Sequence, residues 1–586
     1  MSARIGWVLG LILAVSALPA SGRAQMPAVQ CVPEDALICL HIARPTVLLD
    51  QLADDEMVQA IRSLSLYQQQ TSDPGFQEFL NVVQFLETSL DTDWRSGLAQ
   101  LTGGGITLAV CPDETVLAVV DSQDEHLLGR LHEIFVNIAR SEAQKAGTSE
   151  KVTSREYGDA TVWSFDGREA HAVIGQRFIF ANRFERLQVA LDQQASKGKT
   201  SLADNSAYQV ARRAAGSDAV ATAFVNLKPL VGLPPVTEAL DKSRKNPLAA
   251  LLLAGISESL RDSNWLALRL DVKDRTLALR ALVDGQVAGP PNPAAFAVPQ
   301  NAGAGARPSL SVPRRIAALS LYRDLHGFYA AKDKLFPERT SGLIFFENMM
   351  GIFFTGRDLT SEVLAEAEPG IQIVVAEQRF DPAEGTPAVK LPAFAAILRL
   401  RRPQQFGSVV EEAWQKAIGL INFTRGQQAL PGLIIDRPSH GQIKYTLAYF
   451  SAGEAADKEK LDTRFNVRPT LALPGDYLVL SSTDGLARDL IDALSQAGGE
   501  DVAPLARTDS LLEISGKRVA SILASNRQTL VRQDMVKKGK TKEEAEAGVD
   551  MLVTLLTCVD HVKLSIGRQN DLTQADLSMR LGLPKP

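Results

Sequence analysis

Two Gly-Lys-Thr triplets, at residues 198–200 and 539–541, are the residues whose types come nearest to a phosphate-binding motif. A phosphate-binding loop needs another glycine five residues before the second one, so that backbone N–H groups surround the phosphates, and it follows a strand. Gln193 and Asp534 occupy those positions, and both triplets follow helical patterns. The triplets therefore do not predict a nucleotide site.

Two other groupings contain histidine beside a possible catalytic partner. His132-Glu133 could begin a zinc-protease helix, but the position one turn later, which must carry the second histidine, is Val136. Ser439-His440 lies near Asp436 in a Pro- and Gly-containing stretch that is typical of a turn, whereas a triad requires convergence in space. We expect no catalytic residue, no cofactor-binding residue and no metal site.

The four cysteines, at residues 31, 39, 111 and 558, are too few and too scattered for a disulfide framework or a zinc site. Cys39 and Cys111 occupy comparable faces of two expected strands, so one bridge is possible in an oxidising compartment. Buried free thiols are the alternative that we favour.

Residues 341–354 are apolar around nearly the whole circumference of a helix, within a region (316–465) that holds 17 of the 35 aromatic residues. Such a helix is either buried on most sides or faces something apolar outside its own core. We favour a core helix and expect Phe353→Asp to unfold the second repeat. The alternative is an apolar ligand or partner surface, which would comprise Phe345, Phe346, Met349, Met350, Phe353 and Phe354.

The elements that must position these residues occur twice along the chain. The closest match pairs residues 175–182, a glycine-led strand followed by a helix at 185–193, with residues 475–482 and 485–495. Four further landmarks return in the same order: strands at 36–42 and 315–321, strand pairs beginning at 105 and 370, strand-to-helix segments at 221–233 and 511–524, and terminal hairpins at 265–283 and 561–581. This order favours duplication over chance similarity.

Alternating apolar residues in 265–271 and polar turns at 274–275 and 569–571 indicate antiparallel strands. The expected fold class is α+β, with two tandem, duplicated repeats, each an antiparallel sheet with helices packed on one side. We expect a signal peptide at 1–24, a first repeat at 25–285, a Pro/Ala/Gly-rich linker at 286–313 and an aromatic-rich second repeat at 314–586.

The N-terminus has the pattern of a cleavable secretory signal: Arg4, an apolar run at 8–18 and small residues up to Ala24. The run is shorter than the roughly 20 residues that cross a bilayer, which disfavours an uncleaved anchor. No later segment is apolar enough to span a membrane. We expect a secreted or periplasmic protein.

The charge balance argues against nucleic acid as the partner. The chain has 62 basic and 68 acidic residues. Loss of residues 1–24 would remove Arg4 and Arg23, leaving 60 basic and 68 acidic residues, a net charge of −8. The basic cluster 537–542 is followed at once by glutamates and is typical of a solvated helix junction.

Residues 321–325, 336–346 and 422–436 resemble segments of exported planctomycete proteins that form a domain family of unknown function. The resemblance extends over most of the mature chain. It implies an envelope or periplasmic setting and transfers no activity, cofactor or catalytic residue.

The sequence favours a non-enzymatic binding or structural component of the cell envelope, in which the aromatic second repeat contacts an envelope protein or an apolar ligand. Two alternatives remain open. One is a periplasmic carrier of a lipid or other apolar ligand, and the other is a hydrolase.

Overall fold

The computed structural model describes residues 26–52, 55–62, 71, 74–195, 200–285, 292–301, 303–338, 341–381, 385–451, 461–497 and 503–582. The predicted signal peptide lies outside this part of the chain. The chain divides into two compact units: unit 1 comprises Met1–Leu233 and Ser263–Asp284, and unit 2 comprises Pro234–Asp262 and Gly285–Pro586.

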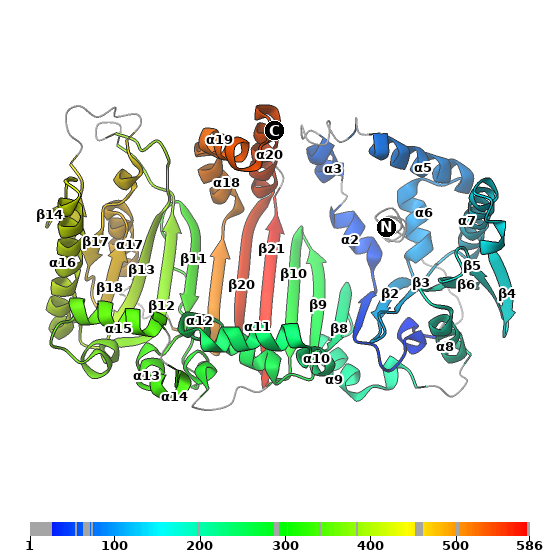
Figure 1. The fold of residues 1–586 in the computed structure, drawn as a ribbon, viewed down its shortest axis with the longest axis horizontal. Coiled ribbons are helices and arrows are strands. Elements are labelled where there is room, and N and C mark those ends of the chain that lie inside the picture. Colours follow the sequence, from blue (N-terminus) through cyan, green and yellow to red (C-terminus); the bar gives the residue numbers. More distant parts are fainter. Residues whose placement is uncertain are drawn as a thin grey trace. The chain divides into compact units, whose positions relative to one another are not determined.

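Unit 1 has an antiparallel sheet in which ten described strands follow the order β10, β9, β8, β1, β2, β3, β7, β6, β5, β4 (Figure 1). The strands are β1 (Ile38–Ile42), β2 (Gly105–Val110), β3 (Val116–Asp121), β4 (Thr153–Tyr157), β5 (Ala160–Ser164), β6 (Ala170–Ile174), β7 (Arg177–Ala181), β8 (Ala221–Asn226), β9 (Trp265–Lys273) and β10 (Thr276–Val283). The principal helices are α2 (Pro45–Leu52), α3 (Asp55–Arg62), α5 (Pro74–Leu90), α6 (Trp94–Thr102), α7 (Glu125–Lys145), α8 (Phe184–Gln194) and α9 (Ser206–Ala215).

Unit 2 has an antiparallel sheet in the order β21, β20, β19, β11, β12, β13, β18, β17, β16, β14, and the short β15 also pairs with β16. The strands are β11 (Arg315–Leu321), β12 (Ala367–Ala376), β13 (Ala393–Leu400), β14 (Ile434–Asp436), β15 (Ser439–His440), β16 (Ile443–Tyr449), β17 (Thr470–Ala472), β18 (Tyr477–Ser481), β19 (Thr508–Ile514), β20 (Val559–Gln569) and β21 (Leu572–Leu581).

The helices of unit 2 include three, α18, α19 and α20, that gather at one end of β20 and β21 (Figure 1). The principal helices are α11 (Pro234–Lys245), α12 (Pro247–Arg261), α13 (Leu325–Ala330), α14 (Lys332–Leu335), α15 (Ser341–Phe353), α16 (Pro403–Gln427), α17 (Asp484–Ala497), α18 (Gly516–Ser525), α19 (Arg527–Lys538) and α20 (Lys542–Thr557).

The α+β class and the antiparallel sheet are confirmed, but helices cover both faces of the sheet in unit 2. Ile397 of β13 packs in one buried cluster with Leu490 of α17, whereas its neighbour Leu398 packs against a second cluster that contains Trp414 of α16. Adjacent residues of a strand point to opposite faces. The prediction of helices on one side is therefore wrong for this unit, because β13 is apolar on both faces and each face needs cover.

Several predicted elements match the structure closely. The expected strand at 315–321 coincides with β11, the strand pair beginning at 105 is β2 and β3, and the expected terminal hairpins are β9–β10 and β20–β21. In addition, the strand orders of the two units correspond position by position, from the terminal hairpin to the outermost strand.

The described part of the predicted linker packs against other segments of unit 2. Pro293–Phe296 forms a 3-10 helix whose first residues are buried, and Ala306 exchanges backbone hydrogen bonds with Thr508 and Leu505 at 2.7 and 2.8 Å. A Cβ at Gly305 would lie 1.9 Å from the carbonyl oxygen of Leu505. Small side chains let this segment approach β19 closely, so a composition that resists helix and sheet does not produce an exposed linker here.

The helical hairpin α11–α12 belongs to unit 2, although its sequence lies within the predicted first repeat. Ala250 of α12 packs with Phe328 and Phe336. The buried guanidinium of Arg323 donates to the carbonyl of Leu252 at 2.7 Å. The hairpin therefore packs within unit 2, although the residues before and after it in the sequence belong to unit 1.

Candidate functional site

A polar cleft lies at one end of the sheet face that α17 covers in unit 2. Beneath α17 this face is apolar, with Val374 and Ala395 in the buried cluster. Toward the end of the strands, Ser320 and Gln372 lie opposite one another in register on β11 and β12, beside Ile397 of β13, which still belongs to the apolar cluster under α17. The face therefore changes from apolar to polar where the helix no longer covers it.

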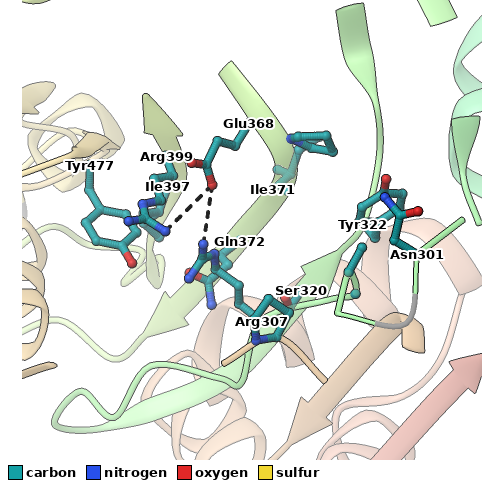
Figure 2. A pocket seen from close by; sticks show the side chains of 15 residues that line it. Asn301, Arg307, Ser320, Tyr322, Glu368, Ile371, Gln372, Ile397, Arg399 and Tyr477 are labelled. Atoms are coloured by element: carbon teal, nitrogen blue, oxygen red, sulfur yellow. Dashed lines mark hydrogen bonds and ion pairs between the residues drawn. The ribbon is translucent and has the colours of Figure 1, made fainter. Parts of the chain in front are cut away.

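The cleft has a volume of about 260 Å³ and combines hydroxyl, amide, guanidinium and carboxylate groups (Figure 2). Arg399 and Tyr477, which are cross-strand partners on β13 and β18, form one wall. Asn301 and Arg307 also line it. Its volume is below the roughly 300–1,000 Å³ of typical ligand pockets, which suits a small molecule.

Glu368 lies between two arginines in this cleft, as the dashed lines of Figure 2 show. Its Oε2 atom is 3.4 Å from Arg307 Nη2 and 3.8 Å from Arg399 Nη1. Arg399 Nη2 is also 3.5 Å from Asp476 Oδ2, which lies outside the cleft lining. The lining itself therefore carries two positive charges and one negative charge.

The hydroxyl of Ser320 is buried without a hydrogen-bond partner among the described residues. Ser320 is 3% exposed and lies in the cleft lining. Its neighbour Gln372 donates from Nε2 to the carbonyl of Pro308 at 2.9 Å and is thereby held in place. A buried hydroxyl without a hydrogen-bond partner costs free energy. A ligand atom that formed a hydrogen bond with Ser320 would recover this cost.

The predicted aromatic segment forms α15, but the helix is not a core helix. Of its residues, Leu343 alone is buried. Phe345 is 65% exposed and Ile352 is 53% exposed, while Ile344 and Phe346 also belong to the exposed apolar residues. The expectation of a core helix is therefore wrong, because the rest of unit 2 covers one side of α15 and leaves the other side open.

The six predicted surface residues divide into two groups. Phe345 and Phe346 are exposed, and Phe346 also makes an edge contact with Tyr329 at a centroid distance of 6.0 Å. Four residues are half-buried: Met349, Met350, Phe353 and Phe354. Phe354 stacks on Phe406 of α16 at 6.5 Å. The second group attaches the helix, and the first group is available for contact.

The hairpin α11–α12 presents a second exposed apolar surface. On α12, Leu248 is 65% exposed, and Leu252 and Leu253 are exposed as well. Directly before them, α11 ends in three basic residues, which are Lys242, Arg244 and Lys245. Residues 242–257 contain no acidic residue. Lys242 Nζ lies 2.8 Å from Glu238 Oε1, and Arg244 Nε lies 3.6 Å from Glu258 Oε1. Lys245 and these two ion-paired cations therefore adjoin the exposed leucines along one continuous stretch of chain.

The rejected motifs have structural roles where the structure describes them. Gly539 ends α19 in the left-handed conformation, and the Thr541 side chain caps α20 with Glu544. The first triplet, 198–200, lies mostly outside the described residues. His440 Nε2 lies 2.8 Å from Asp492 Oδ1 at the surface, and Ser439 pairs in register with Lys444.

The structure brings together two histidines that the sequence does not connect. His132 Nε2 on α7 lies 3.2 Å from His171 Nε2 on β6. Burial, followed by the neighbouring His132, lowers the pKa of His171 to about 4. Because 39 residues separate them, no local spacing could have predicted this pair. Within the described part of the chain, no cluster of three or more His, Cys, Asp or Glu residues could hold a metal ion.

Comparisons with known proteins give no family. No protein-family model and no curated protein matches the chain. Two solved structures, crystal forms I and III of TP0453, align with 45% and 46% of this chain and with 81% and 85% of theirs, at 8% and 10% identity. Both TM-scores are 0.23, too low to support an inference about fold or function. Among the described helices, none is long and apolar enough to cross a bilayer.

Proposed function

We propose that this protein is a non-enzymatic binding component of the cell envelope that docks on a lipid surface through unit 2. The observation that carries the proposal is the exposed apolar face of α15, where Phe345 and Ile352 are more than half exposed. Contiguous exposed apolar surface typically marks a contact with a membrane or another protein. The signal-peptide pattern and the resemblance to exported proteins support a secreted or periplasmic location.

The charge next to the second apolar surface favours lipid as the occupant. An interfacial helix buries its apolar side chains in the acyl boundary while neighbouring Lys and Arg side chains contact anionic headgroups. Leu248 and Leu253, with Lys242 and Lys245 close by in sequence, have this composition. Each basic residue near an anionic surface contributes about 1 kcal/mol, so an anionic surface should be preferred.

The two alternatives receive less support. A lipid carrier needs a large apolar cavity, whereas the cleft described in unit 2 has a volume of about 260 Å³ and includes charged side chains beside Ile371 and Ile397. A hydrolase needs a nucleophile aligned with a base; Asp492 holds His440 at the surface, but among the described residues no hydrogen bond joins the Ser439 hydroxyl to His440.

The proposal includes gene duplication as the origin of the two units. The identical strand order supports this origin, since packing patterns persist longer than residue identities. The second unit would then have gained its exposed aromatic helix after duplication.

The change of Phe345 and Ile352 together to aspartate should weaken lipid binding strongly without unfolding unit 2. Removing two apolar anchors, each worth about 1.5–3 kcal/mol when buried, should weaken binding at least about tenfold. The measurement is co-sedimentation of the full mature chain with phosphatidylcholine vesicles, with and without phosphatidylglycerol, beside thermal unfolding of the free protein.

Val536→Asp is the matched control, because Val536 is a 79% exposed apolar residue on α19 of the same unit. It should bind vesicles as the unchanged protein does. The proposal fails if the unchanged protein does not sediment with either vesicle, or if the Phe345/Ile352 variant sediments as fully as the unchanged protein.

A further inference from the structure

The matching strand orders allow the cleft of unit 2 to be compared with the same position in unit 1. On the central strands, Ser320 and Gln372 pair between β11 and β12 as His41 and Thr107 pair between β1 and β2. At the end of the next two strands, Arg399 and Tyr477 pair as Asp121 and Arg177 do. The four positions of the cleft thus have direct counterparts.

In unit 1 these counterparts form hydrogen bonds and an ion pair with one another. His41 Nδ1 lies 2.9 Å from Thr107 Oγ1. Arg177, which is fully buried, donates to both oxygens of Asp121 at 2.6 and 3.1 Å. It also donates to the carbonyl of Met26 and to Gln194 Oε1, both at 2.6 Å. The N-terminal segment and α8 therefore close this position.

In unit 2 the same position is open. A serine replaces the histidine, so Ser320 does not fill the space that His41 fills, and its hydroxyl has no partner among the described residues. Tyr477 occupies the position that Arg177 has in unit 1. The arginine of this pair is instead Arg399, on the neighbouring strand, at the position of Asp121. The substitutions leave the Ser320 hydroxyl without a partner among the described residues and move the arginine to Arg399, where it pairs with Glu368 and Asp476 beside a cleft.

We propose that this cleft is a binding site for a small, hydroxylated molecule that carries one carboxylate. Glu368 lies beside both Arg307 and Arg399, and Asp476 outside the lining also pairs with Arg399, so recognition of an anion would depend on the direction of the guanidinium N–H groups and not on an excess of positive charge. Guanidinium groups match the planar geometry of a carboxylate. Ser320 and the tyrosine hydroxyls provide partners for hydroxyl groups. The site is independent of the lipid-binding surface on α15.

The test is binding of glucuronate to the full mature chain, measured by isothermal titration calorimetry, with glucose and inorganic phosphate as comparison ligands. Glucose lacks the carboxylate and should bind at least about tenfold more weakly, since a hydrogen bond to a charged group is worth about that factor. Equal binding of glucose and glucuronate, or tighter binding of phosphate, would overturn the ligand class.

Three variants test the position of the site. Arg399→Gln should weaken glucuronate binding about tenfold and Ser320→Ala by a smaller factor, about threefold. Ser320→His should abolish binding by restoring the side chain that fills unit 1. Arg315→Gln is the matched control, because Arg315 pairs with Glu513 on the same sheet and does not line the cleft.

Separate variants distinguish a failure of the cleft proposal from a failure of the lipid proposal. Ser320→His should leave vesicle binding unchanged, and the Phe345/Ile352 double aspartate variant should leave glucuronate binding unchanged. If none of the three ligands binds, or if Ser320→His binds glucuronate as tightly as the unchanged protein, the cleft is not the proposed site.

Discussion

Replacing Arg177 with methionine is expected to destabilise unit 1 by about 3–5 kcal/mol, a large part of a domain's stability. The guanidinium is fully buried and joins Asp121, Gln194 and the carbonyl of Met26. Methionine fills similar space but leaves the largely buried Asp121 carboxylate without its counter-charge. Urea unfolding, followed by tryptophan fluorescence, gives the change in free energy.

Arg183→Met is the control for this prediction. Arg183 is more than half exposed and lies 4.0 Å from Asp113, a surface pair whose loss should cost less than about 1 kcal/mol. A loss of similar size in both variants would show that burial does not determine the effect. A double change of Arg177 to methionine and Asp121 to leucine should recover much of the stability, because no unpaired charge remains buried.

Acid should destabilise unit 1 through His171 between about pH 6.5 and pH 4. Burial lowers the pKa of His171 to about 4, from an ordinary value of 6.5. The unfolded chain therefore binds a proton in this range that the folded unit does not. Stability is complete above the unfolded pKa and is lost as the pH falls toward the folded pKa, by a total of about 3 kcal/mol.

The measurement is the difference in unfolding free energy between the unchanged protein and His171→Phe at several pH values, since other titrations cancel in this difference. Phenylalanine suits the surroundings, where Phe165 and Phe178 lie 4.8 and 5.7 Å from the His171 ring. The difference should move in favour of the variant as the pH falls from 6.5 to 4. A difference independent of pH would contradict the lowered pKa.

Salt should affect the apolar and the charged contribution to lipid binding differently. Lipid contact through α15 depends on apolar area and should persist when salt is raised. The preference for anionic lipid, which depends on Lys242 and Lys245, should decline with salt because exposed charges are screened. A salt series with both vesicle types would separate the apolar and charged contributions.

Local patterns in the sequence were sufficient for many elements. Alternating apolar residues predicted β9, and glycine-led apolar runs predicted β2 and the strand before α8, because side-chain direction in a strand repeats every two residues. The same patterns, read in order along the chain, predicted the antiparallel pairing of the terminal hairpins. Short strands such as β4 and β14 carry little periodicity and were not predicted.

Tertiary packing decided what the local patterns left open. The apolar residues of α15 predicted a helix but not which of its sides are buried, because burial depends on which other segments pack against each side. The cleft joins Ser320, Gln372, Arg399 and Tyr477, which are far apart in sequence and meet only through strand register. Sequence by itself determined the α+β class, the position of many strands along the chain and the pairing of the terminal hairpins, since these depend on local residue types. The tertiary structure alone decided which apolar residues remain exposed and which polar residues converge, because both depend on contacts between distant segments.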